Sequence, residues 1–430
     1  MPMAEHTRVT LRGGRVLDPA GRLDAVLDVH IDGGRIIGLG AAPDGAPGDI
    51  IDVRGCWVLP GLVDLSGQVG SPDALAQREL LAAAAGGITQ LAVPPRVDAG
   101  LDNPAVVGRL RDGAAALGLV RLAPIGALTA GLGGEQLAEL GLLRRAGCRL
   151  VGQGGRPIGA RVLRRAFEYA RGHDLTVVVD AEDAELAAGG CMHEGAVAAQ
   201  LGLTGIPVAA EVAALSQALA LATTCDTRIH VHGLSSAAGV ALLRAAKAAG
   251  LPVTAATPVW NLHYTDLDIG AYDPAFHLRP PLREPGDRAA LREALADGTL
   301  DAVCSDHRPF DGEAKRQPFA RTAPGVAGFQ ALLPLVLDLT RGAGVPLARA
   351  LAALTSGPAA VLGGGGRLAV GALADVCVVE PSRAWAVNAD TWRSAATCTP
   401  VWGRTLCGRV RLTVLGGRVV YRFEEPGDGG

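Results

Sequence analysis

The amino-acid sequence predicts an α/β protein in which a (β/α)8 TIM barrel carries a small β-sandwich domain built from both termini. The chain has 430 residues, more than a single compact domain usually contains. Both ends alternate apolar and polar residues, whereas the middle alternates short apolar runs with helical stretches. The predicted parts are 1–58 (N-terminal part of the sandwich), 59–362 (barrel), 363–423 (C-terminal part of the sandwich) and 424–430 (disordered tail).

The two ends of the chain have the two-residue period of half-buried antiparallel strands. At the N-terminus this pattern appears in VTLRGGRVLD and AVLDVHIDGG, where Gly or Asp breaks each run. It returns near the C-terminus in ADVCVVEP and LCGRVRLTVL, followed by a Gly416-Gly417 turn. Two β-rich ends around a different middle favour one sandwich made from both. The run Gly363–Gly366 lacks the strand, helix and acidic partner of a dinucleotide site and is interpreted as a linker.

The middle of the chain alternates the patterns of buried strands and helices. Short apolar runs such as ITQLAV, LTVVVDA and LDAVCSD alternate with Ala- and Leu-rich stretches such as ALAQRELLAAAAGG. Continuous apolar runs are typical of parallel strands buried on both faces, and their alternation with helices predicts a parallel sheet. Roughly eight such units fit between residues 59 and 362, which favours a closed barrel over an open sheet.

Composition and charge argue against several classes of function. The formal net charge is −3 and the isoelectric point is near 6.3, so no excess of positive charge attracts nucleic acid. The eight cysteines are scattered without a C-x-x-C pair, which predicts buried free thiols in a reducing compartment. The N-terminus has no apolar signal region, and no uninterrupted apolar run reaches the roughly 18 residues of a membrane span. We therefore expect a cytoplasmic protein without membrane contact.

The junction LPGLVDLSGQVGSPD, residues 59–73, closely resembles the first barrel strand of the dihydroorotase family in the amidohydrolase superfamily. The family form of this segment is PGLVD-x-H-x-H-x-R-x-P-G. Further matches follow in the family's order along nearly the whole chain. They include AAAAGGIT (82–89), LDNPAVV (101–107), AEDAELAAGGCMHEG (181–195), RIHVHGLSSA (228–237) and DGTLDAVCSDHRPF (297–310). The resemblance implies a barrel of the amidohydrolase type.

Active members of such a family hold one or two divalent ions, usually zinc, which lower the pKa of a bound water so that hydroxide attacks an amide carbon. The resemblance places the paired histidines of the first strand at Ser66 and Gln68. A neutral hydroxyl or amide is a far weaker zinc donor than imidazole. The bridging ligand falls on Gln153, the strand-5 ligand on Asp180 and the strand-6 ligand on Gly233. We therefore expect no metal.

One family element remains at the end of the barrel. Asp306, in SDHRP, matches the carboxylate that in active members binds metal and shuttles a proton to the leaving nitrogen. It is interpreted as vestigial, because a proton shuttle without metal-activated water has nothing to relay. The family's substrate-binding positions also differ, since the carboxylate clamp is Gly70, an Asn is Pro95 and a second Asn is Arg279. No catalytic residue is expected.

The histidines of RIHVHGL leave an alternative open. His230 and His232 alternate on one strand and could form a relocated ligand pair with Asp180 and Asp306. The simpler interpretation is that they are hydrogen-bonded groups of the barrel core or rim. His193, in CMHEG, is interpreted as a surface or loop residue.

The chain looks similar to a non-catalytic branch of the family, whose members assemble with aspartate carbamoyltransferase. This similarity implies a structural subunit of pyrimidine biosynthesis in a hetero-oligomer, with a homodimer also expected and no cofactor. A second hypothesis is an active zinc-dependent cyclic-amide hydrolase with a remodelled metal site, which hydrolyses dihydroorotate to N-carbamoyl-aspartate. A third is a catalytically silent regulator that binds a metabolite in the old pocket.

Overall fold

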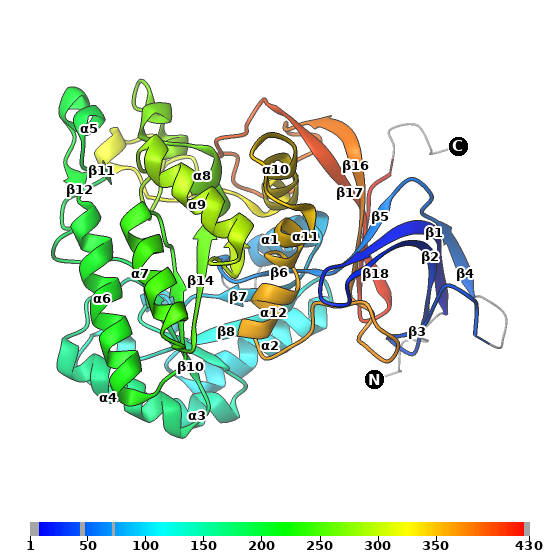
Figure 1. Cartoon of the computed structure of the whole chain (residues 1–430), viewed down its shortest axis with the longest axis horizontal. Coiled ribbons are helices and arrows are strands. Elements are labelled where there is room, and N and C mark those ends of the chain that lie inside the picture. The colour runs from blue at the N-terminus through cyan, green and yellow to red at the C-terminus, as the bar shows by residue number, and fades with distance from the viewer. Residues whose placement is uncertain (1–7, 44–47, 71–73, 425–430) are drawn as a thin grey trace.

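The structure is a computed structural model that describes residues 8–43, 48–70 and 74–424. Figure 1 shows a helix-covered barrel on one side and a curved β-sheet on the other. Residues 425–430, which make up nearly all of the predicted disordered tail, lie outside the described residues.

The barrel is a sheet of eight parallel strands within the described chain, in the order β6-β7-β8-β9-β10-β13-β14-β15. The strands are β6 (Leu62–Asp64), β7 (Ile88–Val93), β8 (Arg121–Ala127), β9 (Leu150–Gly152), β10 (Thr176–Asp180), β13 (Ile229–His232), β14 (Val253–Pro258) and β15 (Ala302–Cys304). The first and last strands approach through a parallel bridge between Gly67 and His307. The predicted (β/α)8 barrel is therefore confirmed.

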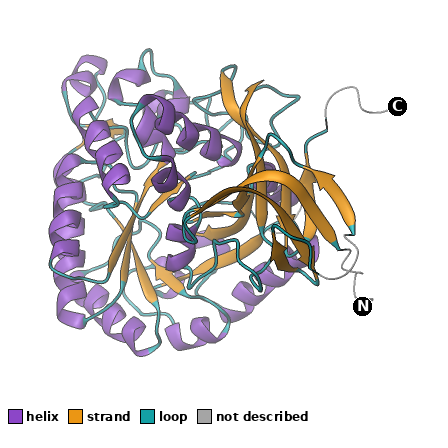
Figure 2. Ribbon diagram, turned by 45° about the vertical axis from the view of Figure 1, so that its right-hand side comes forward, coloured by secondary structure: helices purple, strands orange, loops and turns teal. Residues whose placement is uncertain are grey.

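Helices form a layer around the barrel, as Figure 2 shows. They are α1 (Ala74–Ala85), α2 (Pro104–Leu117), α3 (Leu140–Arg145), α4 (Ala160–Gly172), α6 (Val208–Cys225), α7 (Ala237–Ala248), α8 (Val259–His263), α9 (Pro285–Asp297), α10 (Phe329–Gly342), α11 (Leu347–Ala352) and α12 (Ser356–Val361). Local sequence sets their ends. In α2, Asn103 accepts the Ala105 N–H, Pro104 occupies the first turn, and Gly118 ends the helix in a left-handed conformation.

One barrel helix, α6, is long and apolar enough to cross a membrane by length and composition. It packs between α4 and α7 in the outer layer of the barrel. Its Glu211 is buried and accepts hydrogen bonds from Ser235 and Ser236, at the start of α7. The helix therefore has the contacts of a barrel helix.

The strands of both termini form one mixed sheet in the order β18-β17-β16-β5-β1-β2-β3, with β4 paired to β1. The strands are β1 (Val9–Asp18), β2 (Leu23–Asp32), β3 (Arg35–Leu39), β4 (Asp49–Asp52), β5 (Trp57–Pro60), β16 (Val376–Ala386), β17 (Thr405–Leu415) and β18 (Arg418–Arg422). The two ends meet where β5 pairs antiparallel with β16, with Val58 opposite Val378. A separate apolar core lies beneath the sheet. The predicted β-domain from both termini is thus confirmed, and its strands share one continuous curved sheet.

A short inserted segment lies between β10 and α6 and contains β11 (Met192–His193), α5 (Ala196–Leu201) and β12 (Gly205–Ile206). The interpretation of His193 as a surface residue is wrong, because it is buried on β11. Its Nδ1 atom lies 3.1 Å from the buried guanidinium of Arg283. All eight cysteines are free thiols as predicted, six of them buried and two partly buried.

Candidate functional site

The carboxyl ends of the barrel strands bring several predicted positions together. Ser66 follows β6, His232 ends β13 and Asp306 follows β15. Asp180, at the end of β10, is paired in register with His232 on the neighbouring strand. In (β/α)8 enzymes this end of the barrel carries the active site.

Asp306 is the centre of a buried polar cluster. Its Oδ1 atom accepts hydrogen bonds from Ser66 Oγ at 3.1 Å and from Arg308 Nη2 at 3.2 Å. His232 Nε2 lies 3.8 Å from the same oxygen, and the Asp306 side chain is only 4% exposed. Burial acts to raise the pKa of Asp306, but the charge of Arg308 and the hydrogen bonds outweigh it and lower the pKa to about 2. The carboxylate is therefore ionised and is already compensated by groups of the chain itself.

Arg308 is the residue of this site that the sequence analysis missed. Besides its contact with Asp306, its guanidinium donates to the Arg279 carbonyl at 3.2 Å. The sequence signal was weak: Arg308 stands only two residues after Asp306, but Asp306 has φ +46°, so the alternation of an extended strand does not place the two side chains together.

Asp64 is hydrogen-bonded to Ser66, a member of this cluster, and to Ser305, which precedes Asp306. Its carboxylate accepts the N–H of Ser66 at 3.1 Å, and the N–H and Oγ of Ser305 at 3.2 and 2.5 Å. Burial raises the pKa of Asp64 to about 6 in spite of these bonds. Asp64 thus links the ends of β6 and β15 and has a structural role.

The two histidines of β13 do not converge on one point. His230 Nδ1 lies 2.9 Å from Thr254 Oγ1, and its buried Nε2 has no hydrogen-bond partner. Burial lowers the pKa of His230 to about 3, so the ring is neutral. Burial also acts to lower the pKa of His232, but the Asp306 carboxylate overcomes this and raises it. Across the described ranges, no three His, Cys, Asp or Glu side chains are arranged to hold a metal.

The other positions that correspond to family ligands make contacts of their own. The Gln153 amide donates to Thr129 Oγ1 at 2.9 Å and to a backbone carbonyl, and Asp180 accepts the Gly155 N–H at 2.6 Å. Gly233 has φ +75°, and a Cβ there would lie 3.3 Å from Pro280 Cδ.

Zinc sites in this fold need imidazole and carboxylate ligands directed at one point. The described residues at the carboxyl ends of the barrel strands, the barrel mouth, do not fit such an ion. No catalytic step through a metal follows from this geometry.

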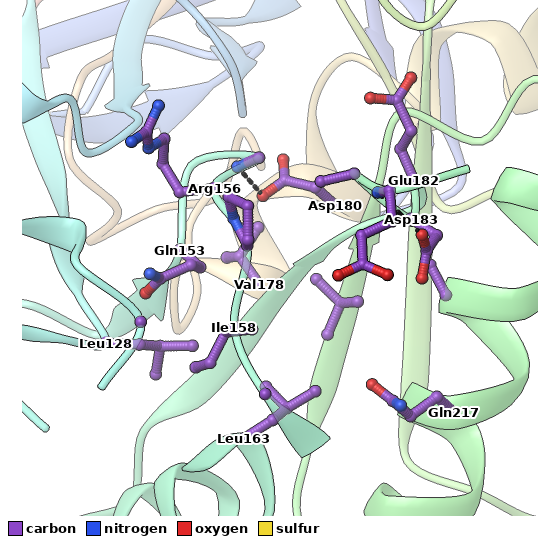
Figure 3. Close-up of a pocket in the computed structure, with 18 of the residues that line it drawn as sticks. Leu128, Gln153, Arg156, Ile158, Leu163, Val178, Asp180, Glu182, Asp183 and Gln217 are labelled. Carbon is purple, nitrogen blue, oxygen red and sulfur yellow. Dashed lines mark hydrogen bonds between the residues drawn. The ribbon is translucent and has the colours of Figure 1, made fainter. Parts of the chain in front are cut away.

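A cavity of about 480 Å3 opens at the ends of β9 and β10 and is also lined by residues of α4 and α6; neither Asp306 nor Ser66 lines it. Figure 3 shows Gln153 and Asp180 in its wall, together with Arg156. Its lining includes one arginine and five carboxylates, namely Glu135, Asp180, Glu182, Asp183 and Glu185. Like charges repel a carboxylate ligand. This excess of acidic side chains does not favour an anionic ligand in the cavity.

The positions that correspond to the substrate clamp are dispersed. The Arg279 guanidinium forms an ion pair with Glu182 at 2.5 Å and so does not extend freely toward a ligand. Gly70 and Gln68 border a second cavity of about 370 Å3, where Arg96 donates to Gln68 Oε1 at 2.8 Å. Pro95 is buried, with its carbonyl close to Gly154. The structure does not assemble these positions into one anion-binding site.

Comparison with known proteins agrees with the fold. The pattern of the amidohydrolase family matches residues 145–420. A dihydroorotase-like protein of Pseudomonas aeruginosa is 42% identical over 96% of this chain and 99% of its own length. A dihydroorotase of Syntrophotalea carbinolica is 39% identical over 97% of this chain and 100% of its own.

Solved structures with the same fold include the L-hydantoinase of Arthrobacter aurescens, with a TM-score of 0.84 and 24% identity over 97% of this chain and 96% of that one. The dihydropyrimidinase of Brevibacillus agri has a TM-score of 0.83 at 22% identity, over 96% and 95% of the two chains. At this identity the likeness concerns the fold. The matched family pattern and the sequence relatives show that this chain belongs to the amidohydrolase family, as a dihydroorotase-like member.

Proposed function

We propose that this protein is a catalytically inactive dihydroorotase homologue that serves as a structural subunit for aspartate carbamoyltransferase in pyrimidine biosynthesis. One observation carries the proposal. Asp306, the single family ligand that remains, is buried and bound by Ser66 and Arg308 of the same chain. A carboxylate in this state is not available to hold a metal or to relay a proton to a substrate.

Two further observations support the proposal. The substrate positions Gly70, Pro95 and Arg279 do not form a clamp, and the neighbouring cavity is rich in carboxylates. Two relatives, 42% and 41% identical, carry the name dihydroorotase-like protein. A barrel that keeps its full length without this chemistry is useful through its shape or surface, and assembly is the simplest such use.

The competing hypothesis is an active cyclic-amide hydrolase, which the name dihydroorotase of other relatives favours. Such an enzyme would need a remodelled metal site. His232 and Asp306 could supply two ligands, but among the described residues no third His, Cys, Asp or Glu side chain is arranged beside them to complete a metal site. Metabolite binding in the cavity beside Asp180 is a third function, and it is compatible with assembly.

The test is co-expression with the aspartate carbamoyltransferase of the same organism, followed by size-exclusion chromatography with mass determination. We expect one hetero-oligomer at micromolar concentration, with at least the roughly 1,200 to 2,000 Å2 interface of a specific complex. A homodimer of this chain alone and a location in the cytoplasm belong to the same proposal. Asp306→Asn is the informative variant, because it abolishes any metal chemistry while keeping the shape of the side chain. It should assemble like the wild type.

Separate elution of the two proteins, with a transferase that is fully active alone, would remove the assembly function. Dihydroorotate hydrolysis by the wild type but not by Asp306→Asn would instead establish the active-enzyme hypothesis.

A further inference from the structure

We infer that the guanidinium of Arg308 is a built-in cation of the barrel mouth, which takes the place of a divalent ion as the counter-charge of Asp306 and excludes metal from this position. The contacts between Arg308 and Asp306 lie within one chain, so they do not depend on assembly with a transferase.

Three groups converge on one oxygen. Asp306 Oδ1 accepts hydrogen bonds from Ser66 Oγ at 3.1 Å and from Arg308 Nη2 at 3.2 Å, and His232 Nε2 lies 3.8 Å from the same oxygen. A cation bound to this oxygen would have to displace the guanidinium or approach it closely. Like charges at such a distance repel strongly in a buried site.

The position of Arg308 is built into the fold. Its N–H donates to the Val326 carbonyl at 2.9 Å, and its guanidinium also donates to the Arg279 carbonyl at 3.2 Å. Gly325 has φ +129°, and a Cβ there would lie only 2.6 Å from Arg308 Cδ. The absence of a side chain at Gly325 leaves room for the arginine stem. The Arg308 side chain is 24% exposed, so it is held mostly within the protein.

The electrostatic balance of the mouth depends on this residue. Asp306 is 4% exposed, and an ionised carboxylate is costly to bury without a positive partner. Ser66 contributes a neutral hydroxyl, and His232 is more distant. Arg308 is therefore the main positive charge beside the carboxylate.

A double-mutant cycle tests the counter-ion role. The variants are Arg308→Met, Asp306→Asn and the pair, compared by urea unfolding of the whole chain at one pH. We expect Arg308→Met to lower the folding equilibrium constant at least tenfold more in the wild-type background than in Asp306→Asn, a coupling of about 1.4 kcal/mol. Arg316→Met is the matched control, because Arg316 is exposed on the following loop. It should change the urea midpoint little.

Additive effects in the cycle would overturn the counter-ion role. Arg308→Lys keeps the test usable if Arg308→Met does not fold, because a retained positive charge should preserve most of the wild-type stability. Loss of stability in Arg308→Lys equal to that in Arg308→Met would also contradict the inference.

Zinc alone is the probe for exclusion. In equilibrium dialysis the Arg308→Met variant should bind Zn2+ at least tenfold more tightly than the wild type, and Asp306→Asn in the same background should remove the gain. Equal zinc binding by wild type and Arg308→Met would overturn the exclusion of metal.

Discussion

Removal of the Glu79 carboxylate should destabilise the closure of the barrel. Glu79 on α1 and His307 after β15 are both fully buried, with Oε2 and Nε2 3.0 Å apart. His307 Nδ1 accepts the Gly328 N–H at 3.0 Å, so the proton of the neutral ring is on Nε2 and faces Glu79. The ring N–H is not well aligned with the carboxylate oxygen, but no other acceptor is near it. Glu79 Oε1 also accepts the Ala395 N–H at 2.8 Å.

The size of the effect follows from these contacts. Glu79→Ala leaves two buried donors, on His307 and Ala395, without an acceptor. Each costs about 1–3 kcal/mol, so we expect a loss of about 2–6 kcal/mol. Glu79→Gln keeps one carbonyl acceptor and should cost about half as much.

Urea unfolding followed by circular dichroism measures the change. Glu313→Ala is the control, because Glu313 is exposed and its replacement should stay within about 0.5 kcal/mol of the wild type. A loss below about 1 kcal/mol for Glu79→Ala would refute the reasoning, because the buried pair would then contribute almost nothing.

The same pair predicts a dependence on pH. Burial acts to raise the pKa of Glu79, but the His307 N–H that faces the carboxylate and the groups of Ser394 and Ala395 outweigh it and lower the pKa below its ordinary value of 4.5. A carboxyl group whose pKa is lower in the folded state stabilises the fold above its unfolded pKa. The stabilisation is lost as the pH falls from 4.5 through the folded value. Glu79→Gln should lack this part of the acid dependence.

Three further predictions concern other parts of the chain. The double variant Ser66→His and Gln68→His should not hydrolyse dihydroorotate, and activity in a spectrophotometric assay would contradict the account of the lost ligands. Gly233→His should lower the urea midpoint by the equivalent of about 1–3 kcal/mol, because φ is +75° there; an unchanged midpoint would show that the backbone adapts. Burial lowers the pKa of Lys315 from 10.5 to about 8, so wild-type stability should rise between pH 8 and 10.5, and a Lys315→Met variant should not show this rise.

Much of the fold could be predicted because it depends on local patterns. Apolar runs alternate with helical stretches, and this periodicity is enough to place parallel strands and covering helices. A single β-domain made from both termini followed from the same reasoning, whereas the pairing of β5 with β16 within it is a finding of the structure. Ser66 and Asp306 were also expected in one place, because the resemblance assigns both of them to metal-ligand positions of the family.

The remaining features depend on contacts between distant segments. His193 is buried because Arg283, ninety positions further along the chain, reaches its ring, and no local pattern near CMHEG reveals this. Glu79 similarly has its partner, His307, just after the last barrel strand. The role of Arg308 could not be predicted from its spacing to Asp306, and only the structure shows that the side chain turns inward.

The metal content of the purified protein tests the central claim most directly. Inductively coupled plasma mass spectrometry on protein expressed with zinc in the medium, after gel filtration without chelator, should find well under one equivalent of zinc per chain. The cause is the Asp306 carboxylate, just after the last barrel strand, which is already bound by Ser66 and Arg308. One or more equivalents of zinc that remain bound, and that Asp306→Asn removes, would contradict the claim.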